Sequence, residues 1–366
     1  MYSVRIYPHS NSAHVSQIYA GLYDLQATGK VKLKISLDTH SKPPEFRKNV
    51  LWSEVTNGST VRHACFDMED SGQLLSMENL RHVDKYFKRS YEPQFFQTLP
   101  SELSRKILPY GLNYPSRSQY ERGPYRIFLY NIASGSFKQN PLKTFKNIIG
   151  YPLKLLLYRC NLLSAGDTAE FAGDDFVVEA EEPAERKIFF QTRIWSHKDA
   201  PYSPEEQLRA TNQMRIDVVR RLKKEFGDMF VGGITRTPLA EKECPDCIAP
   251  LSGDKKEYLS TLKKCLVAVT TTGLHQSTGW KLAEYVASAR CIVTEPLEYA
   301  LPNPLEENKN IITFHTPEEC VQACRKILDD PDFARQMRKN NAEYYQKYVK
   351  PSQLIDRCLT KLFEDV

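Results

Sequence analysis

The stretch "TTTGLHQSTGWKLAEY", residues 270–285, places hydroxyls, two glycines and a carboxylate around the start of a predicted helix. The first turn of a helix leaves backbone N–H groups unpaired and carries positive partial charge, which favours phosphate. Gly273 and Gly279 let a ligand approach the backbone closely. Ser277 or Thr278 can cap the helix or donate a hydroxyl to the same ligand. The stretch therefore predicts phosphate binding at its first helical turn.

Glu284 lies about six residues into this helix, roughly 9 Å along its axis. Because helical side chains lean toward the N-terminus, its carboxylate can accept two hydrogen bonds from a diol beside the phosphate. A ribose is such a diol, so a nucleoside diphosphate fits both features. Lys281 is a second candidate for the phosphate. The alternative is that Glu284 only pairs with Lys281 and that Gly279 only eases a tight turn.

Strand and helix patterns alternate along both halves of the chain, which is typical of parallel βαβ units. In the first half, "YSVRIYP" and "VKLKISLD" read as strands on either side of the helix "HVSQIYAGLYDLQATG". In the second half, "KIFFQTRIW", "DMFVGGI", "LVAVTTTG", "CIVTEP" and "NIITFH" read as strands separated by helices. We expect an α/β protein with two Rossmann-like domains. In such sheets, ligands bind outside the carboxyl ends of the strands.

The distribution of charged residues along the sequence indicates where the domains begin and end. No acidic residue lies between Glu121 and Asp167, and the interval 122–159 carries seven cations together with the apolar run "IIGYPLKLLLY". The following run, "GDTAEFAGDDFVVEAEEPAE", is acidic and contains no Lys or Arg. We predict domains at 1–165 and 187–330, an acidic linker over 166–186, and helices over 331–366.

The composition narrows the function class. The net charge of +5 is too mild to indicate a nucleic-acid binder, and no run approaches the roughly 20 apolar residues of a membrane span. The N-terminus does not resemble a signal peptide, and nine scattered cysteines fit a reducing cytosol. Cys244 and Cys247 have CxxC spacing, but no second pair completes a zinc site, so a loop with two incidental thiols is expected. No clear metal motif is present, so we expect no tightly bound metal or cofactor.

Together, the strand, the decorated helix with its late Glu, and the next strand ending in Glu295 resemble the donor site of GT-B glycosyltransferases. The stretch is most similar to the "glycosyl transferases group 1" type of bacterial surface-polysaccharide enzymes. That family often shows Glu, seven residues and Glu, with a glycine three residues after the first Glu. Glu284 matches the second Glu and Gly279 the glycine, whereas Gln276 stands where the family has the first Glu.

The resemblance implies roles for further residues and domains. Glu284 would bind the donor ribose, and position 276 would contact the donor sugar. Arg193, at the end of the first strand of the second half, would neutralise the donor diphosphate. The domain 1–165 would bind the acceptor, 187–330 would bind the nucleotide sugar across a cleft between the two, and the helices at 331–366 would cross back to the first domain. Asn212 and Arg215 are weaker candidates.

Residues of the acceptor side must come from loops at strand ends of the first domain. An inverting transfer needs a carboxylate or a His as base. The loop "PHSNSAH" offers His9, Asn11 and His14, and "CFDMEDSG" offers Asp67, Glu69 and Asp70. His9, Asp67 and Asp70 are the candidate catalytic residues, although three acids in one turn are often merely solvated. Asn11, Lys88 and Arg89 are the candidates for acceptor binding, the latter two for an anionic acceptor.

The sequence thus predicts a cytoplasmic, metal-independent glycosyltransferase that acts in cell-surface polysaccharide or lipopolysaccharide synthesis. Its partners would be a nucleotide sugar and a glycan or lipid-linked acceptor, with peripheral contact to the inner membrane through the basic interval 122–159. A non-catalytic nucleotide- or sugar-binding protein of the same fold is the alternative, because Gln276 replaces a carboxylate. An oxidoreductase is disfavoured, because "YPHSNSAH" lacks the glycines of a dinucleotide-binding turn.

Overall fold

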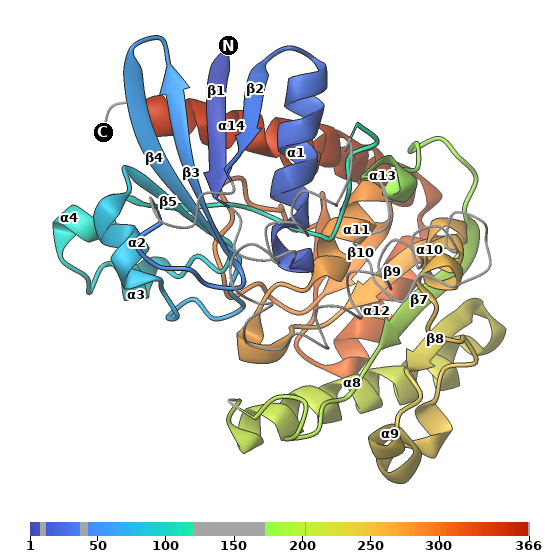
Figure 1. Ribbon diagram of the computed structural model, residues 1–366. Helices are drawn as coiled ribbons and strands as arrows, with labels where there is room; N and C mark the ends of the chain where they lie inside the picture. Colours follow the sequence, from blue (N-terminus) through green and yellow to red (C-terminus); the bar gives the residue numbers. More distant parts are fainter. Residues whose placement is uncertain (8–11, 37–42, 121–172, 202, 365–366) are drawn as a thin grey trace, which may run out of the picture. The chain divides into compact units, whose positions relative to one another are not determined.

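The computed structural model describes residues 1–7, 12–36, 43–120, 173–201 and 203–364. These form two compact α/β units (Figure 1), each described by itself below. The first unit comprises Met1–Asp175 and Lys350–Val366, and the second comprises Phe176–Val349. The predicted α/β class with two sheet-containing units is confirmed. The basic interval 122–159 lies outside the described residues, so membrane contact through it stays a prediction.

The first unit has a six-stranded sheet of order β2-β1-β3-β4-β5-β6. Its strands are β1 (Tyr2–Tyr7), β2 (Val31–Ile35), β3 (Val50–Asn57), β4 (Thr60–Asp67), β5 (Lys85–Lys88) and β6 (Ile107–Pro109). The predicted opening βαβ unit is present, since β1 and β2 are parallel. The strand β3 is antiparallel to both β1 and β4, so the sheet is mixed rather than parallel throughout. The carboxyl ends of β1, β4 and β5 nevertheless share one edge.

Helices α1 (Ser16–Ala27) and α14 (Pro351–Phe363) pack side by side against this sheet (Figure 1). Their apolar side chains, among them Ile18, Leu22 and Ile355, form one buried cluster with the sheet residues. The unit also contains α2 (Met77–His82), α3 (Pro93–Phe96), α4 (Ser101–Ser104) and the 3₁₀ turns η1 (Ala13–Val15) and η4 (Gly173–Phe176). The last helix of the chain therefore completes the core of the first unit.

The second unit has a five-stranded parallel sheet of order β11-β10-β9-β7-β8. Its strands are β7 (Glu185–Thr192), β8 (Phe230–Ile234), β9 (Cys265–Thr270), β10 (Cys291–Thr294) and β11 (Ile311–Thr313). Its helices are α8 (Glu205–Phe226), α9 (Pro238–Glu243), α10 (Lys255–Lys264), α11 (Trp280–Ala287), α12 (Pro317–Asp329), α13 (Pro331–Tyr344) and the π-helix η8 (Tyr345–Val349). Short 3₁₀ turns are η5 (Gly227–Met229), η6 (Pro245–Cys247) and η7 (Leu274–Gln276). All strands point their carboxyl ends to one edge.

Sequence signals at helix ends explain several of these boundaries. Thr316 caps α12 by accepting a hydrogen bond from the Glu319 backbone N–H, and Gly227 with φ 50° ends α8. At the start of α8, Pro204 occupies the N-cap position, so no side chain caps this helix. The predicted segment 331–366 is divided: α13 packs on α11 and α12, whereas α14 packs on α1.

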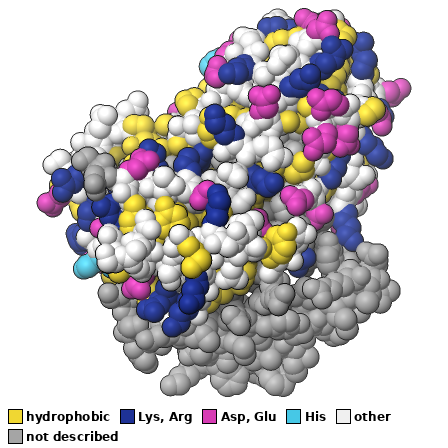
Figure 2. All heavy atoms as spheres, turned by 90° about the horizontal axis from the view of Figure 1, so that it is seen from above, with side chains coloured by type: hydrophobic (Ala, Val, Ile, Leu, Met, Phe, Trp, Pro, Cys, Tyr) yellow, Lys and Arg dark blue, Asp and Glu magenta, His cyan; other side chains and the backbone are white. Residues whose placement is uncertain are grey.

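Positively and negatively charged side chains are mixed over the visible surface. On the face drawn in Figure 2, Lys and Arg side chains are interspersed with Asp and Glu side chains, as the mild net charge suggests. None of the helices in the described ranges is long and apolar enough to cross a membrane.

Gly21 sets the distance between α1 and α14. A Cβ at this position would lie 2.4 Å from the Pro351 carbonyl oxygen and 2.5 Å from Ile355 Cγ1. We expect Gly21→Ala to lower the free energy of unfolding of the first unit by about 1–3 kcal/mol, because the two helices must move apart. Thermal unfolding checks this. The control is Gly279→Ala, where a Cβ meets nothing within 4 Å; equal losses in both variants would contradict the packing argument.

Candidate functional site

The loop between β9 and α11 is held in a strained conformation. His275 and Gln276 both have φ 55°, a left-handed backbone that costs energy for residues other than glycine. The Gly273 backbone N–H donates to the Ser277 carbonyl over 2.9 Å. A Cβ on Gly273 would lie 2.7 Å from Ser277 Oγ, so a larger residue there would force the serine side chain to turn away. The strain lies where the sequence predicts ligand binding.

The helix α11 begins without a side-chain cap. Its N-cap is Gly279, so the predicted cap by Ser277 or Thr278 does not form. The predicted positions Gln276, Ser277, Thr278 and Gly279 line a small pocket with Thr270–Thr272, Leu282, Thr294 and Leu297. Its volume of about 10 Å³ holds about one water molecule. A pocket of this size is too small for a nucleotide.

Glu284 is buried and forms an ion pair, but not with Lys281. Its side chain is 1% exposed, and Oε1 accepts a hydrogen bond of 2.6 Å from Lys255 Nζ at the start of α10. Oε2 accepts no hydrogen bond from the described residues. Burial and the nearby Glu284 carboxylate raise the pKa of the Tyr258 hydroxyl well above its usual range. Sequence reasoning missed Lys255, because its partner lies 29 positions away.

Lys281 lies in a cluster of positive charge. Its Nζ donates to the Gln191 carbonyl at the end of β7. Burial lowers its pKa to about 7, and the positive charges of Arg215, Lys255 and Arg193 contribute in the same direction. The carboxylate of Glu284 opposes them only in part. The cluster therefore has an excess of positive charge, which favours an anionic ligand.

Arg215 joins the loops that follow β7 and β9. Its guanidinium donates to the Arg193 carbonyl at 2.6 Å, the Thr272 carbonyl at 2.7 Å and Thr271 Oγ1 at 3.0 Å. Burial lowers its pKa to about 10, so it remains charged at neutral pH. From the same helix, Asn212 exchanges two hydrogen bonds with the backbone of Trp195. Arg215 and Asn212, which the sequence suggests only as weak candidates, thus hold the backbone of the loops that form the site.

Arg193 follows β7 and has an exposed side chain, as expected. Its guanidinium stacks 3.4 Å from the centre of the Trp195 ring. Three buried polar atoms near the carboxyl edge of the sheet have no hydrogen-bond partner among the described residues: Gln191 Oε1, Trp195 Nε1 and Glu284 Oε2. Since buried polar atoms are nearly always hydrogen-bonded, these atoms suit a polar ligand or ordered water.

The family comparison concerns this unit. Residues 248–360 match the family model described as "Glycosyl transferase-like". This segment is glycosyltransferase-like. The match includes β9, the strained loop, α11 and Glu284, and it confirms the resemblance drawn from these residues. It does not reach Arg193 or Arg215. Among curated proteins, none matches the sequence.

Several solved structures are similar at low identity. The C-terminal domain of a glycosyl transferase group 1 family protein, LpcC from Francisella tularensis, is 11% identical, with a TM-score of 0.35 over 48% of this chain and 97% of that chain. A TarM variant from S. aureus, in complex with fondaparinux, alpha-GlcNAc-glycerol and UDP, is 16% identical, with a TM-score of 0.37 over 51% of this chain and 38% of that chain. A glycosyltransferase from Rickettsia africae is 12% identical, with a TM-score of 0.40 over 76% of this chain and 62% of that chain. This chain thus spans less than two thirds of the last two proteins.

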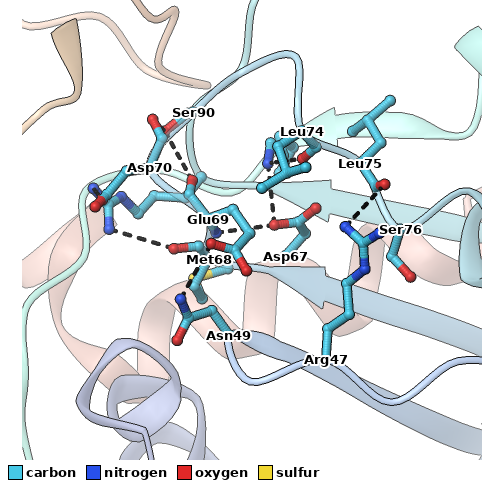
Figure 3. Close-up of polar contacts among 12 residues, drawn as sticks. Arg47, Asn49, Asp67, Met68, Glu69, Asp70, Leu74, Leu75, Ser76 and Ser90 are labelled. Carbon is cyan, nitrogen blue, oxygen red and sulfur yellow. Dashed lines mark hydrogen bonds and ion pairs between the residues drawn. The ribbon is translucent and has the colours of Figure 1, made fainter. Parts of the chain in front are cut away.

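On the acceptor side, Asp67 and Lys88 do not face solvent. Both side chains are 0% exposed, and they form an ion pair of 3.0 Å. The Tyr86 hydroxyl also donates to Asp67, and Lys88 donates to the Leu74 carbonyl at 2.8 Å. Figure 3 shows Asp67 directed into this network below the loop. In this structure the pair neutralises itself inside the unit, which leaves neither a base nor an acceptor-binding cation accessible there.

Asp70, Arg89 and His14 form an accessible group at the same sheet edge. Arg89 Nη2 donates to Asp70 Oδ1 over 2.5 Å, and Nη1 lies 3.3 Å from His14 Nδ1. The Asp70 side chain is 39% exposed. Burial and then the Arg89 charge lower the pKa of His14, which keeps its ring neutral at pH 7. His9 and Asn11 lie outside the described residues.

The described ranges contain neither a metal-binding site nor a reactive cysteine pair. No group of three His, Cys, Asp or Glu side chains there could hold a metal ion. Cys244 and Cys247 are both buried, and burial raises the pKa of Cys247 to about 12. A thiol with so high a pKa is a poor nucleophile at neutral pH.

We expect Arg215→Met to lower the free energy of unfolding of the second unit by about 3 kcal/mol, because the change leaves buried acceptors unsatisfied. Chemical denaturation with a fluorescence probe measures this loss. The matched control is Arg209→Met on the same helix, whose side chain is 78% exposed and whose ion pair with Glu205 is superficial. If the loss in Arg215→Met is no larger than in the control, the three hydrogen bonds of Arg215 contribute little to the stability of the second unit.

Proposed function

We propose that this protein is a glycosyltransferase that moves a sugar from a nucleoside-diphosphate sugar to a glycan or lipid-linked acceptor in cell-surface polysaccharide synthesis. The observation that carries the proposal is the buried Glu284, which keeps one carboxylate oxygen unpartnered beside a strained glycine-containing loop at the carboxyl edge of a parallel sheet. The family match over the same residues supports it.

Each residue of the second unit has a chemical role in this proposal. Glu284 Oε2 accepts a hydrogen bond from a ribose hydroxyl. Arg193 and Lys281 neutralise the diphosphate as it departs, which lowers the energy of the transition state. The Gln276 side chain hydrogen-bonds the donor sugar without adding charge. The cations supply the compensation that a metal would otherwise give, so the transfer proceeds without a tightly bound metal.

In the first unit, Asp70 is the candidate base that removes the proton of the acceptor hydroxyl in an inverting transfer. Its hydrogen bond from Arg89 orients the carboxylate. The second candidate function is a non-catalytic nucleotide- or sugar-binding protein of the same fold. Gln276 and the self-neutralised Asp67 favour it, because both remove carboxylates that could take part in transfer.

UDP, GDP or another nucleoside diphosphate is expected to raise the melting temperature, and Glu284→Gln is expected to abolish most of that shift. The amide keeps the shape of the side chain but loses the charged acceptor for the ribose. The control is Glu298→Ala, an exposed carboxylate beyond β10. Differential scanning fluorimetry over a panel of nucleotides is the measurement. The donor-site assignment fails if no nucleotide shifts the wild-type curve.

Affinity for a nucleoside-diphosphate sugar is expected to fall as pH rises from 7 to 9, by at most tenfold per pH unit. Lys281, with its pKa of about 7, is protonated below that value and contributes charge; above it, binding must first take up a proton. The groups that face Lys281 are the cations Arg215, Lys255 and Arg193 and the carboxylate of Glu284. Calorimetry at several pH values measures the slope. Lys281→Met should bind weakly with no slope, and a slope that persists in this variant contradicts the assignment.

Transfer itself distinguishes the two candidate functions. With the best-binding nucleotide sugar, an enzyme should release nucleoside diphosphate in the presence of chelator, and Asp70→Asn should release it at least tenfold more slowly. A binding protein should give the same thermal shift and no release. The Asp70→Asn variant should keep the wild-type shift, since Asp70 lies in the other unit.

A further inference from the structure

A second pocket lies in the first unit, at the sheet edge opposite Asp70 and Arg89. It sits where β5 and β6 begin and where α14 ends, and its volume is about 330 Å³. That volume is within the range of roughly 300–1,000 Å³ typical of small-molecule sites. Its lining includes four cations, Arg62, Lys85, Arg105 and Lys106, and two acids, Asp84 and Glu364.

Lys85 is the unusual residue of this pocket. The residue is 7% exposed, and its side chain lines the pocket together with the acids Asp84 and Glu364, whose charges act on its ammonium group. Buried lysines are almost always paired, because an uncompensated buried charge is costly. Burial and the neighbouring Arg62 charge lower the pKa of Lys85. The side chain shares a face of the sheet with Arg62, since Lys85 pairs with Ala64 on the neighbouring strand.

The two acids of the pocket are engaged with other groups. Asp84 Oδ2 accepts a hydrogen bond of 2.6 Å from the His63 backbone N–H, and Glu364 pairs with Lys361 at 2.5 Å. Lys106 donates only to backbone carbonyls of α2. The four cations therefore leave at least two positive charges in excess over the two acids.

We propose that this pocket binds a phosphate group, carried either by a soluble phosphate compound or by an anionic lipid headgroup, with Lys85 and Arg105 as its principal ligands. A phosphate monoester carries about −1.5 to −2 charge at pH 7, which matches the excess. A phosphate also accepts hydrogen bonds on several oxygens, so one group can engage the buried ammonium and the exposed Arg105 guanidinium together. A single carboxylate would leave part of the charge uncompensated.

The site is independent of the proposed glycosyl transfer. It lies at the amino ends of β5 and β6, away from the loops that carry Asp70 and Arg89, and none of its residues belongs to the second unit. Failure of one proposal therefore leaves the other intact. To separate the two sites in practice, phosphate binding is measured in the Arg193→Ala background, where the nucleotide site is weakened.

The test uses the full chain with inorganic phosphate and pyrophosphate as probes, followed by calorimetry and thermal shift. The variants are Lys85→Met, which keeps the apolar stem, and Arg105→Ala, which changes an exposed side chain. The matched control is Lys32→Met, which removes one exposed charge of the same unit outside the pocket. We expect the dissociation constant to weaken at least tenfold in both pocket variants and to stay unchanged in the control.

Without ligand, Lys85→Met should melt at a higher temperature than the wild type, because the variant removes one of the four mutually repelling cations of the pocket. A lysine that only packs would give an equal or lower melting temperature. Co-sedimentation with phosphatidylglycerol vesicles, compared with phosphatidylcholine vesicles, distinguishes the sources: Lys85-dependent binding to the former identifies a headgroup, and binding of free phosphate alone identifies a soluble compound. The proposal is overturned if neither probe nor anionic vesicle binds, or if Lys32→Met weakens binding as much as Lys85→Met.

Discussion

The buried guanidinium of Arg215 is the interaction on which the candidate nucleotide site depends. Two separate loops, after β7 and after β9, offer backbone carbonyls and a hydroxyl to one side chain of α8. Carbonyls that point away from a strand end need donors, and a guanidinium supplies several in a rigid plane. The carbonyl of Arg193 is fixed in this way, so the exposed guanidinium of the same residue starts from a defined position. Glu295 also fixes the loop after β9, because its side chain accepts a hydrogen bond of 2.7 Å from the Thr272 backbone N–H.

Buried charges in both units are satisfied by partners from other elements. Lys255 of α10 meets Glu284 of α11, and Lys88 of β5 meets Asp67 of β4. Such pairs contribute little net stability, since desolvation offsets their attraction. A wrong arrangement of strands and helices, however, would leave a buried charge without a partner. They therefore favour one arrangement of strands and helices over its competitors. The pocket around Lys85 differs, because four cations there face only two acids, and we propose an anionic ligand for it.

Much of the architecture follows from local sequence patterns. Alternating strands and helices of period 3.6 predict two α/β units, and glycines or threonines mark several helix ends correctly. The strand β3 and its antiparallel pairing with β1 and β4 escape this reasoning, because the order of strands in a sheet depends on neighbours distant in sequence. The sequence predicts that the helices over 331–366 pack on the first domain. In the structure α14 belongs to the first unit and α13 to the second, and this division depends on which surfaces the two helices contact.

The site was predictable only where its residues are contiguous. Gly273, Gly279 and Glu284 stand in one stretch, so their spacing on a loop and helix can be read directly. Lys255 and Arg215 reach the site by tertiary packing, and no local pattern distinguishes them from other cations of α10 and α8. Asp67 was chosen because it ends a strand. Its burial depends on Lys88 and Tyr86, which arrive from the neighbouring strand.

The placement of α14 has a consequence for folding during synthesis on the ribosome. Helix α1 emerges early, yet the surface that packs against it, including Ile355, is encoded more than 300 residues later. At translation rates of about 5–20 residues per second, α1 waits for its partner for roughly a quarter of a minute or longer. The second unit, which ends at Val349, is synthesised entirely within that interval. The first unit can therefore complete its core only after the whole second unit has been synthesised.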